Sequence, residues 1–448
     1  MPSPLYPDIM SLRYFGTDGI RGIALQTPLT LEEVTRWGTA WRQVAEGAGV
    51  TRLVRGWDPR TSSEALAEAF IQGVGAGFPV LSLGMAPTPA VAWNVARLSA
   101  EGNRTWGLMI SASHNPPKDN GLKGFNELGE KLEEDEERAI EAAFEEAVTA
   151  TAPAPKPSHL GLGPYLAHLE GIDLPAGFRV VIDCAHGATA EAAPRLFRGA
   201  EVHWLGCPAD GQRINVGVGS THLDALAAVV TAQRAHLGIA FDGDGDRCLL
   251  VDSTGTPVDG DQMLWLLVQD RIAIGDPPPG VVGTLMTNGG FAQALEEAGI
   301  PFVRTAVGDK YLLREMAKRK WDLAAEASGH LIQKRIGPSG DGLTAALAIL
   351  RALLHRPADR RWDWTFRPWP QVLVNIKARE RRAVPDCHTL VAAMSTIDHR
   401  WGHGVRQVVR WSGTEPKLRL MVEAREDAWV GQALTELEAA ARLDLGLS

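Results

Sequence analysis

The chain is poor in cysteine and has no long apolar run. Its four cysteines, among 448 residues, show no paired C-x-x-C spacing, so neither a disulfide framework nor a structural zinc site is expected. No run approaches the roughly 20 apolar residues that span a bilayer, and residues 1–13 hold no apolar stretch of signal-peptide length. We therefore expect a cytoplasmic protein with no membrane partner. The cysteines are Cys184, Cys207, Cys248 and Cys387.

The chain also lacks an excess of positive charge. Its formal net charge is −9, which argues against broad binding of a nucleic-acid backbone, because that binding needs a basic face. Any anionic ligand must therefore meet a local basic pocket. The length of 448 residues is too great for one hydrophobic core and predicts three or four domains.

Short apolar runs that end at polar or glycine-rich corners alternate with helical patterns, which is typical of α/β domains. Ligands of α/β sheets gather beyond the carboxyl ends of the strands, so the polar segments after these runs are the candidate sites. The predicted strands are 52–56, 107–110, 179–182, 237–241 and 280–285.

Three breaks in the pattern divide the chain. Residues 131–150 predict a helix with Ile140, Phe144 and Val148 on one buried stripe, and a proline-rich connector follows. A turn near residue 254 and an Arg- and Trp-rich stretch around 355–367 are the other breaks. The predicted domains are 1–155, 156–254, 255–363 and a smaller α+β unit, 364–448.

Three carboxylates separated by glycines, Asp242, Asp244 and Asp246, follow the strand 237–241. Glycine lets the backbone turn tightly enough to aim alternate side chains at one hard cation. The segment is no EF-hand loop, because its sixth position is Arg247 rather than Gly and its twelfth is a serine. An acidic turn without metal is the alternative, but crowded carboxylates repel one another. The sequence therefore favours a divalent metal site.

A serine, Ser113, stands in the polar segment 111–123 after the strand 107–110. His114 follows it and two prolines stiffen the loop, which is a setting typical of a nucleophile. The G-x-S-x-G pattern of an acyl-transfer elbow is absent. For this loop taken alone, a serine that only caps a turn is the alternative.

The segment 410–419 lies between two strand patterns and combines arginine with small hydrogen-bond donors. Arginine offers a bidentate fork to phosphate, and hydroxyls and glycine N–H groups supply short donors in a concave loop. A hairpin turn with incidental polar residues is the alternative. The candidate phosphate ligands are Arg410, Ser412, Gly413, Thr414 and Arg419.

A further polar segment, 326–330, follows an apolar stretch. Glu326 and Ser328 lie two residues apart, which suits paired sugar hydroxyls, and His330 could shuttle a proton. Each of these residues, taken singly, is also compatible with an ordinary core position.

Taken in their order, these four segments resemble those of the α-D-phosphohexomutase superfamily, over essentially the whole chain. The opening segment 14–22 adds to the likeness. This resemblance implies an α/β protein with three mixed-sheet domains of related topology and a smaller α+β C-terminal domain around a central cleft. Within the superfamily, the segments that look most like the bacterial phosphoglucosamine mutases are 283–288, 307–311, 339–342 and 412–416.

The resemblance implies an isomerase that interconverts glucosamine 6-phosphate and glucosamine 1-phosphate, feeding the synthesis of UDP-N-acetylglucosamine and cell-wall precursors. Ser113 would be carried as phosphoserine and would share one Mg²⁺ per chain with Asp242, Asp244 and Asp246. Glucosamine or glucose 1,6-bisphosphate would be the intermediate and the activator. The resemblance also allows a homodimer.

The same resemblance assigns the remaining roles. Four residues are candidates for proton transfer, Arg21, His114, Lys123 and His330, of which Lys123 and His330 are favoured. The substrate-binding residues would be Arg247, Lys310, Glu326, Ser328, Arg410, Ser412, Gly413, Thr414 and Arg419.

The chain departs from the phosphoglucosamine mutase pattern at three places. Trp411 stands where a proline is usual. Ala327 is an unusual residue within the segment 326–330, called the sugar segment below, and residues 124–126 lack the usual aromatic run. These departures bear on the sugar pocket. Three rivals therefore stay open: a phosphomannomutase/phosphoglucomutase with the same mechanism, a monoester phosphatase, and a sensor of sugar phosphates, which would have no use for Ser113 beside the aspartates.

Overall fold

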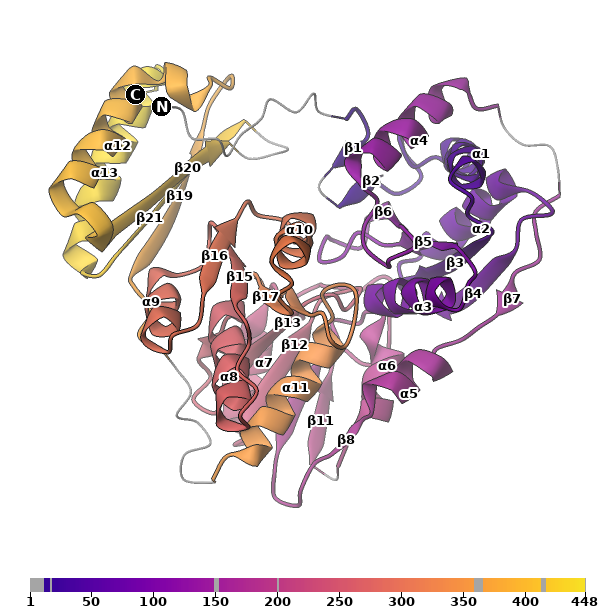
Figure 1. Cartoon of the computed structure of the whole chain (residues 1–448), viewed down its shortest axis with the longest axis horizontal. Helices are drawn as coiled ribbons and strands as arrows, with labels where there is room; N and C mark the ends of the chain where they lie inside the picture. Colours follow the sequence, from indigo (N-terminus) through magenta and orange to yellow (C-terminus); the bar gives the residue numbers. More distant parts are fainter. Residues whose placement is uncertain are drawn as a thin grey trace.

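The computed structural model forms four domains that follow one another in an arc, from domain I at the right of Figure 1 to domain IV at the left. Within the part of the chain that the structure describes, no helix is long and apolar enough to cross a membrane. The structure describes residues 12–16, 18–148, 153–199, 201–357, 366–411 and 416–447.

Domain I is a seven-stranded mixed sheet in the order β1-β2-β6-β5-β3-β4-β7. Strand side chains alternate between the two faces, so Trp106 and Leu108 pack with α1, α2 and α4, whereas Met109 packs with α3. The elements are β1 (Phe15–Gly16), β2 (Gly19–Ile23), α1 (Leu31–Gly47), β3 (Arg52–Trp57), α2 (Ser63–Val74), β4 (Val80–Met85), α3 (Thr88–Ala100), β5 (Thr105–Ile110), β6 (Asp119–Phe125), α4 (Glu134–Glu146) and β7 (Ser158–His159).

The helix predicted over 131–150 is α4, and its buried stripe is shorter than expected. Ile140 and Phe144 are buried, and Phe144 stacks on Trp37 with ring centroids 3.6 Å apart. The prediction for Val148 was wrong: its side chain is 82% exposed, because the helix ends at Glu146 and the chain turns away from the core.

Domain II places its strands in the order β11-β9-β12-β13-β14, and α7 covers one face. All five residues of β12 are buried, as expected for a strand covered on both faces. The elements are α5 (Gly163–Leu169), β8 (Ile172–Asp173), β9 (Val180–Asp183), α6 (Thr189–Leu196), β10 (Phe197–Arg198), β11 (Val202–Leu205), α7 (Leu223–Ala232), β12 (Leu237–Phe241), β13 (Cys248–Asp252) and β14 (Pro257–Val258).

Domain III is a four-stranded sheet in the order β16-β15-β17-β18, with α10 packed on one face. Its helix α11 packs against β12 and β13, so domains II and III share one hydrophobic core. The elements are α8 (Gly260–Ala273), β15 (Val281–Thr284), α9 (Gly289–Glu297), β16 (Phe302–Thr305), α10 (Asp309–Arg319), β17 (Leu323–Ala325), β18 (Leu331–Gln333) and α11 (Gly342–His355).

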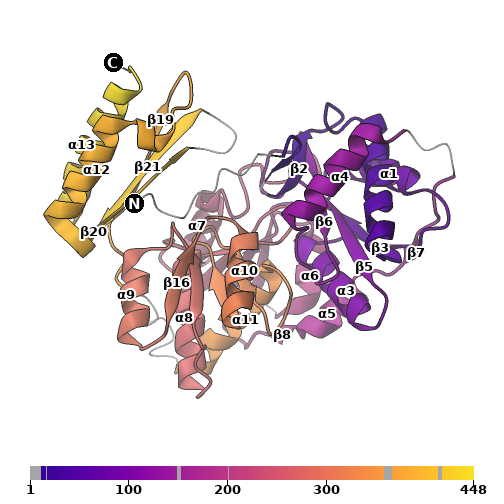
Figure 2. The same cartoon turned by 45° about the horizontal axis from the view of Figure 1, so that its top comes forward.

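Domain IV is smaller and has its own core. Its antiparallel sheet, in the order β19-β21-β20, carries α12 and α13 on one face, as Figure 2 also shows. The elements are β19 (Gln371–Lys377), η1 (Val384–Asp386), α12 (His388–Trp401), η2 (Gly402–Gly404), β20 (Val405–Trp411), β21 (Lys417–Ala424) and α13 (Asp427–Asp444).

The predicted fold class is confirmed: three mixed-sheet α/β domains precede a smaller domain of strands and helices. The five predicted strands correspond to β3, β5, β9, β12 and β15, within two residues at each end. The strand β7 adds to the sheet of domain I, and β14 adds to that of domain II. The predicted boundary between residues 363 and 364 lies outside the described residues.

Candidate active site

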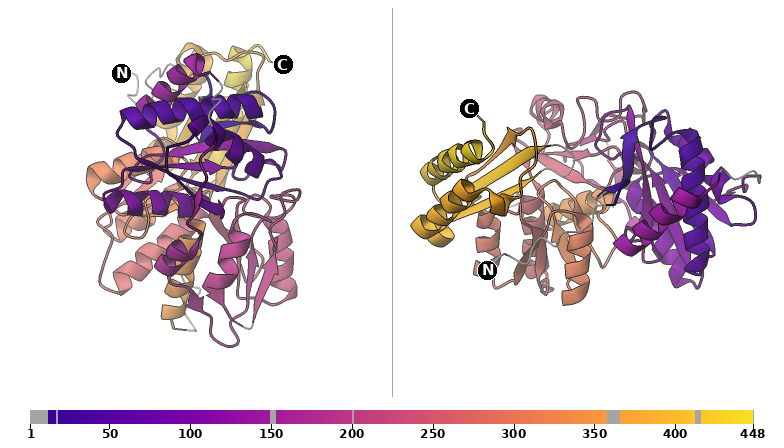
Figure 3. Two further views of the ribbon diagram at one scale, coloured as in Figure 1. Left: turned by 90° about the vertical axis from the view of Figure 1, so that its right-hand side faces the viewer. Right: turned by 90° about the horizontal axis from the view of Figure 1, so that it is seen from above.

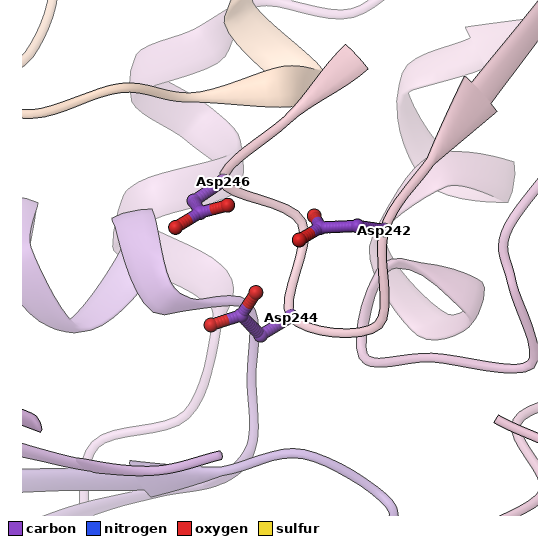
Figure 4. A group of neighbouring side chains, drawn as sticks. All are labelled: Asp242, Asp244 and Asp246. Carbon is purple, nitrogen blue, oxygen red and sulfur yellow. The ribbon is translucent and has the colours of Figure 1, made fainter. Parts of the chain in front are cut away.

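The acidic loop joins β12 to β13 and gathers its three carboxylates in one place. Asp242 and Asp244 are fully buried, and Asp246 is 5% exposed. One oxygen from each lies within 4.8 Å of the others, and Figure 4 shows the three side chains turned toward a shared space. Gly243 is required here, because a Cβ at this position would lie 2.7 Å from the Ser113 carbonyl oxygen. The acidic loop therefore fits closely against the loop 111–118, which carries Ser113 and is called the serine loop below.

The pKa values of two of the carboxylates are shifted in opposite directions. Burial raises the pKa of Asp242 well above its usual range, and the charges of Asp246 and Asp244 raise it further. Burial has the same effect on Asp246, but the positive charges of Lys123 and of protonated His330 outweigh it and hold the pKa of that carboxyl below its usual range. The loop therefore keeps negative charge in a buried place.

The loop fits a divalent cation. One oxygen of Asp244 and one of Asp246 are buried and have no hydrogen-bond partner, although carboxylate oxygens normally accept several. A set of carboxylate oxygens is what hard divalent cations prefer. The residues present therefore suit the predicted metal site.

The nucleophile candidate, Ser113, touches the acidic loop directly. Its Oγ donates a 2.6 Å hydrogen bond to Asp242 and lies 3.2 Å from Nδ1 of His114. The residue is 1% exposed and has a φ of 53°, in the left-handed region that non-glycine residues rarely adopt. Such a conformation persists only where surrounding contacts hold it.

Those contacts come from residues that the sequence analysis missed. The Arg60 guanidinium donates to the carbonyl oxygens of Ser113 (2.9 Å) and Asn115 (2.8 Å), and it pairs with buried Asp58. Asn215 of domain II donates to the same two carbonyls. Asp58 and Arg60 directly follow β3, so the strand-end rule could have found them, whereas no local pattern marks Asn215.

Two of the predicted proton carriers, Lys123 and Arg21, lie beside the aspartates. The Lys123 ammonium is buried, 2.7 Å from Asp244 and 3.0 Å from Asp18. Arg21 pairs with Asp18 and donates to the carbonyl oxygen of Ala112. Asp18 lies in the opening segment 14–22, to which the sequence analysis assigned no role, and it pairs with both cations.

The two histidines also lie at the site. Burial lowers the pKa of His114 to about 4, and the nearby charges of Arg247 and Arg21 act in the same direction, so His114 is neutral at pH 7. His330 lies 4.0 Å from Asp246 and 3.9 Å from Asp309, and its Nε2 has no hydrogen-bond partner. A Cβ at Gly340 would lie 2.2 Å from this ring, so that glycine makes room for it.

Domain III is joined to this site by an ion pair that the sequence analysis missed. Lys131 of domain I bridges Asp18 and Asp309, the latter at 2.8 Å. Burial raises the pKa of Asp309, but the charges of Lys131 and His330 prevail and hold it at about 2. Lys310 follows Asp309, and its charge acts on buried Glu137 of α4.

The sugar segment adjoins the acidic loop. Glu326 accepts a 2.9 Å hydrogen bond from the Gly308 N–H, and its other oxygen accepts from the Ser328 hydroxyl at 3.2 Å. Arg247 lies between the two segments, because its Nε is 3.9 Å from Asp246 and the charge of Glu326 also acts on it. Glu326, Ser328 and Arg247 therefore form one polar group at the edge of the metal loop.

The predicted phosphate ligands belong to domain IV. Arg410 of β20 and Arg419 of β21 are directly opposite each other in the antiparallel ladder, so both side chains leave the same face of the sheet. Ser412, Gly413 and Thr414 lie outside the described residues. Domain IV has its own hydrophobic core and lies at one end of the molecule, beside domain III, in the right-hand view of Figure 3.

Models of all four domains of one family match the chain. The phosphoglucomutase/phosphomannomutase alpha/beta/alpha domains I, II and III match residues 12–150, 164–255 and 259–361. The C-terminal domain of the same family matches residues 373–440. The four matches occur in the family order.

Relatives with similar full-length sequences carry one name. The phosphoglucosamine mutase of Azotobacter vinelandii is 42% identical over 439 residues, covering 94% of this chain and 96% of the relative. The phosphoglucosamine mutase of Pseudomonas syringae pv. syringae is 40% identical over 448 residues, covering 95% and 98%.

Solved structures share the fold at lower identity. A phosphoglucomutase/phosphomannomutase family protein of Burkholderia thailandensis superposes with a TM-score of 0.78 at 22% identity, covering 96% of this chain and 97% of that one. Aspergillus fumigatus N-acetylphosphoglucosamine mutase, solved with GlcNAc-6P and magnesium, gives 0.63 at 17% identity, covering 98% and 97%. With the four domain matches and the full-length relatives, these likenesses show that the chain belongs to the α-D-phosphohexomutase superfamily, in which it is similar to the phosphoglucosamine mutases.

Proposed function

We propose that this chain is a phosphoglucosamine mutase that interconverts glucosamine 6-phosphate and glucosamine 1-phosphate. The observation that carries the proposal is the 2.6 Å hydrogen bond from the Ser113 Oγ to Asp242, inside a buried group of three carboxylates. A serine held against such a group is placed for phosphoryl transfer, which depends mainly on positioning and electrostatics.

The chain positions the serine before any substrate arrives. Arg60 and Asn215 both donate hydrogen bonds to the carbonyl oxygens of Ser113 and Asn115. The Ser113 N–H donates to the Ser111 hydroxyl oxygen at 2.9 Å. These contacts hold the backbone of the loop in place, and the Ser113 Oγ points toward Asp242. Carried as phosphoserine, Ser113 donates its phosphoryl group to one hydroxyl of the sugar monophosphate, which gives a 1,6-bisphosphate. After the sugar turns over, the other phosphate returns to Ser113.

Proton transfer accompanies each phosphoryl transfer. The sugar hydroxyl loses a proton when its oxygen accepts phosphorus, and the reverse step returns one. His330, which has a buried Nε2 without a hydrogen-bond partner, is the proposed acceptor in its neutral form, and once protonated it is charged beside Asp246 and Asp309. Lys123 is paired with two carboxylates and donates a hydrogen bond to Asp244, so it offsets negative charge at the site.

Asp242, Asp244, Asp246 and the Ser113 oxygen would hold one Mg²⁺, which prefers a few carboxylates together with phosphate oxygens. When bound, the ion offsets negative charge on the phosphoryl group. Arg247 stands at the edge of the same loop and offsets charge on the side of the sugar segment.

Substrate recognition is assigned to domains III and IV. Glu326 and Ser328 would bind sugar hydroxyls, and Lys310 would contribute a positive charge. Arg410, Arg419 and the segment 412–414 would hold the phosphate that does not react. Because domain IV has its own core, it can move as a unit toward the site and exclude water from the bisphosphate.

Several features of this proposal come from the sequence prediction. The domain boundaries would lie at residues 155, 254 and 363, with the short strands β7 and β14 crossing them to extend the sheet of the preceding domain, and each domain would contribute one loop to the site. Glucosamine or glucose 1,6-bisphosphate would act as activator, and the chain would work in the cytoplasm, as a homodimer if the resemblance extends so far. The main rival is a phosphomannomutase/phosphoglucomutase, against which the names of the full-length relatives speak.

Replacing the nucleophile tests the proposal. Ser113→Ala should lower turnover of glucosamine 6-phosphate by more than about 10³-fold, because the variant lacks the oxygen that is proposed to carry the phosphoryl group. Circular dichroism should show an intact fold, and Ser395→Ala on exposed α12 should keep full activity as the matched control. Near-normal turnover by Ser113→Ala would remove Ser113 from the reaction.

A second variant tests the metal site. Asp244→Asn should weaken Mg²⁺ binding, measured by titration calorimetry, and lower kcat by about 10²-fold or more, since it removes an anionic ligand and the partner of Lys123. Asp173→Asn is the control, because this carboxylate is 78% exposed and pairs only with Arg198 among the described ion pairs. If Asp244→Asn kept both metal affinity and activity, the site would lie elsewhere.

The choice of sugar is tested by direct comparison. With Mg²⁺ and catalytic bisphosphate present, kcat/KM for glucosamine 6-phosphate should exceed the values for glucose 6-phosphate and mannose 6-phosphate by at least about tenfold, or about 1.4 kcal/mol. A higher kcat/KM for either neutral sugar would favour the phosphomannomutase/phosphoglucomutase alternative.

A further inference from the structure

Two cysteines of domain II stand at adjacent strand ends behind the acidic loop. Cys184 directly follows β9, and Cys207 follows β11, which runs parallel to β9 with Leu205 opposite Asp183. The Cys184 N–H donates to the Leu205 carbonyl oxygen at 3.0 Å. Neighbouring strands lie about 4.8 Å apart, and a disulfide joins Cα atoms about 4.4 to 6.8 Å apart. Gly206 lies beside Cys184 in this register and Cys207 is the next residue, so the two cysteines are near neighbours at the ends of adjacent strands.

The two thiols already contact each other. They form a hydrogen bond between their side chains, both are free cysteines, and the Cys207 Sγ also donates to the Ala190 carbonyl oxygen at 3.7 Å. Cys184 is fully buried, whereas Cys207 is partly exposed. Cys207 is therefore the more accessible of the two residues.

The environment divides the roles of the two sulfurs. The hydrogen bond from Cys184 lowers the pKa of Cys207 to about 7, although burial opposes this effect. The same hydrogen bond and burial raise the pKa of Cys184 well above its usual range. The thiolate is the reactive form of cysteine, so Cys207 is the attacking residue and Cys184 the resolving one.

We propose that Cys184 and Cys207 form a reversible redox site that reacts with small-molecule disulfides such as glutathione disulfide. The Cys207 thiolate attacks one sulfur of the small disulfide, forms a mixed disulfide and expels one small thiolate. Cys184 then loses its proton to water, and its sulfur attacks the Cys207 sulfur and expels the second small thiolate. The protein loses two electrons and two protons, and the small disulfide is reduced to two thiols.

This site is coupled to the proposed active site through the turn 184–188. The Ala188 N–H donates to the Gly243 carbonyl oxygen at 2.8 Å, inside the acidic loop. The Ala185 carbonyl oxygen accepts from the Asn215 N–H at 2.9 Å, and the Asn215 side chain in turn holds the Ser113 carbonyl. The turn therefore supports both the acidic loop and the serine loop.

Disulfide formation moves this turn. Ala185 and His186 have φ values of 54° and 51°, so the turn is held in the left-handed region by its contacts and has little freedom to adapt. Two hydrogen-bonded sulfurs must approach to about 2.0 Å to form the bond. A misplacement of about 1 Å in catalytic groups costs about 10²-fold in rate. Oxidation should therefore lower turnover by a factor of that order.

Thiol mapping tests the site without reference to the proposed function. The full chain is treated with glutathione disulfide, alkylated, digested and analysed by mass spectrometry. The expected product is a peptide pair joined through Cys184 and Cys207, two hydrogens lighter than the reduced pair, and dithiothreitol should restore all four thiols. If Cys184 and Cys207 stayed alkylatable, or if Cys207 ended as a stable mixed disulfide, the proposal would be overturned.

Variants test the assigned roles and the coupling. Cys184→Ser should stop at a mixed disulfide on Cys207, and Cys207→Ser should keep its activity under the oxidant while the wild type loses about 10²-fold and recovers with dithiothreitol. Cys387→Ser in domain IV is the matched control and should be inactivated like the wild type. Oxidation of Cys207→Ser to the same loss would overturn the coupling. The disulfide is detected by mass spectrometry and not by activity. A missing disulfide and a missing mutase activity are therefore separate outcomes.

Discussion

Three buried carboxylates in one short loop impose the constraint on which the site depends. At 4.8 Å, two like charges repel by about 3 to 4 kcal/mol for an effective dielectric constant of about 20. Lys123 alone cannot offset three such charges, so further positive charge must converge on the loop. The structure supplies it through Lys123 of domain I and through Arg247, which lies beside the loop, and it leaves two carboxylate oxygens for a cation.

The same constraint adds ion pairs between domains that already share apolar contacts. Domain I contributes the cation that meets the loop of domain II, and Lys131 ties domain I to Asp309 of domain III. Domains II and III share a core, so the relative position of the acidic loop and the sugar segment is fixed by packing. Domain IV has a separate core and the arginine pair of β20 and β21, which suits a part that moves.

Much of this fold and site follows from local sequence. A buried strand that ends in a polar cluster predicted the position of Ser113 and of the aspartates, because both the hydrophobic run and its polar end lie within about ten residues. Helix ends are less secure: Val148 continued the apolar period of α4, yet the helix had already ended. Residues that act across domains, such as Asn215 and Asp309, leave no local pattern, since their partners lie far away in sequence.

The central claim is that Ser113 carries the phosphoryl group, and a labelling experiment tests it most directly. The chain is incubated with Mg²⁺ and ³²P-labelled glucose 1,6-bisphosphate, digested, and the labelled peptide is sequenced by mass spectrometry. We expect the label on Ser113, and we expect unlabelled glucosamine 6-phosphate to remove it into the sugar product. Label on another residue, or label on Ser113 that the sugar cannot remove, would contradict the account.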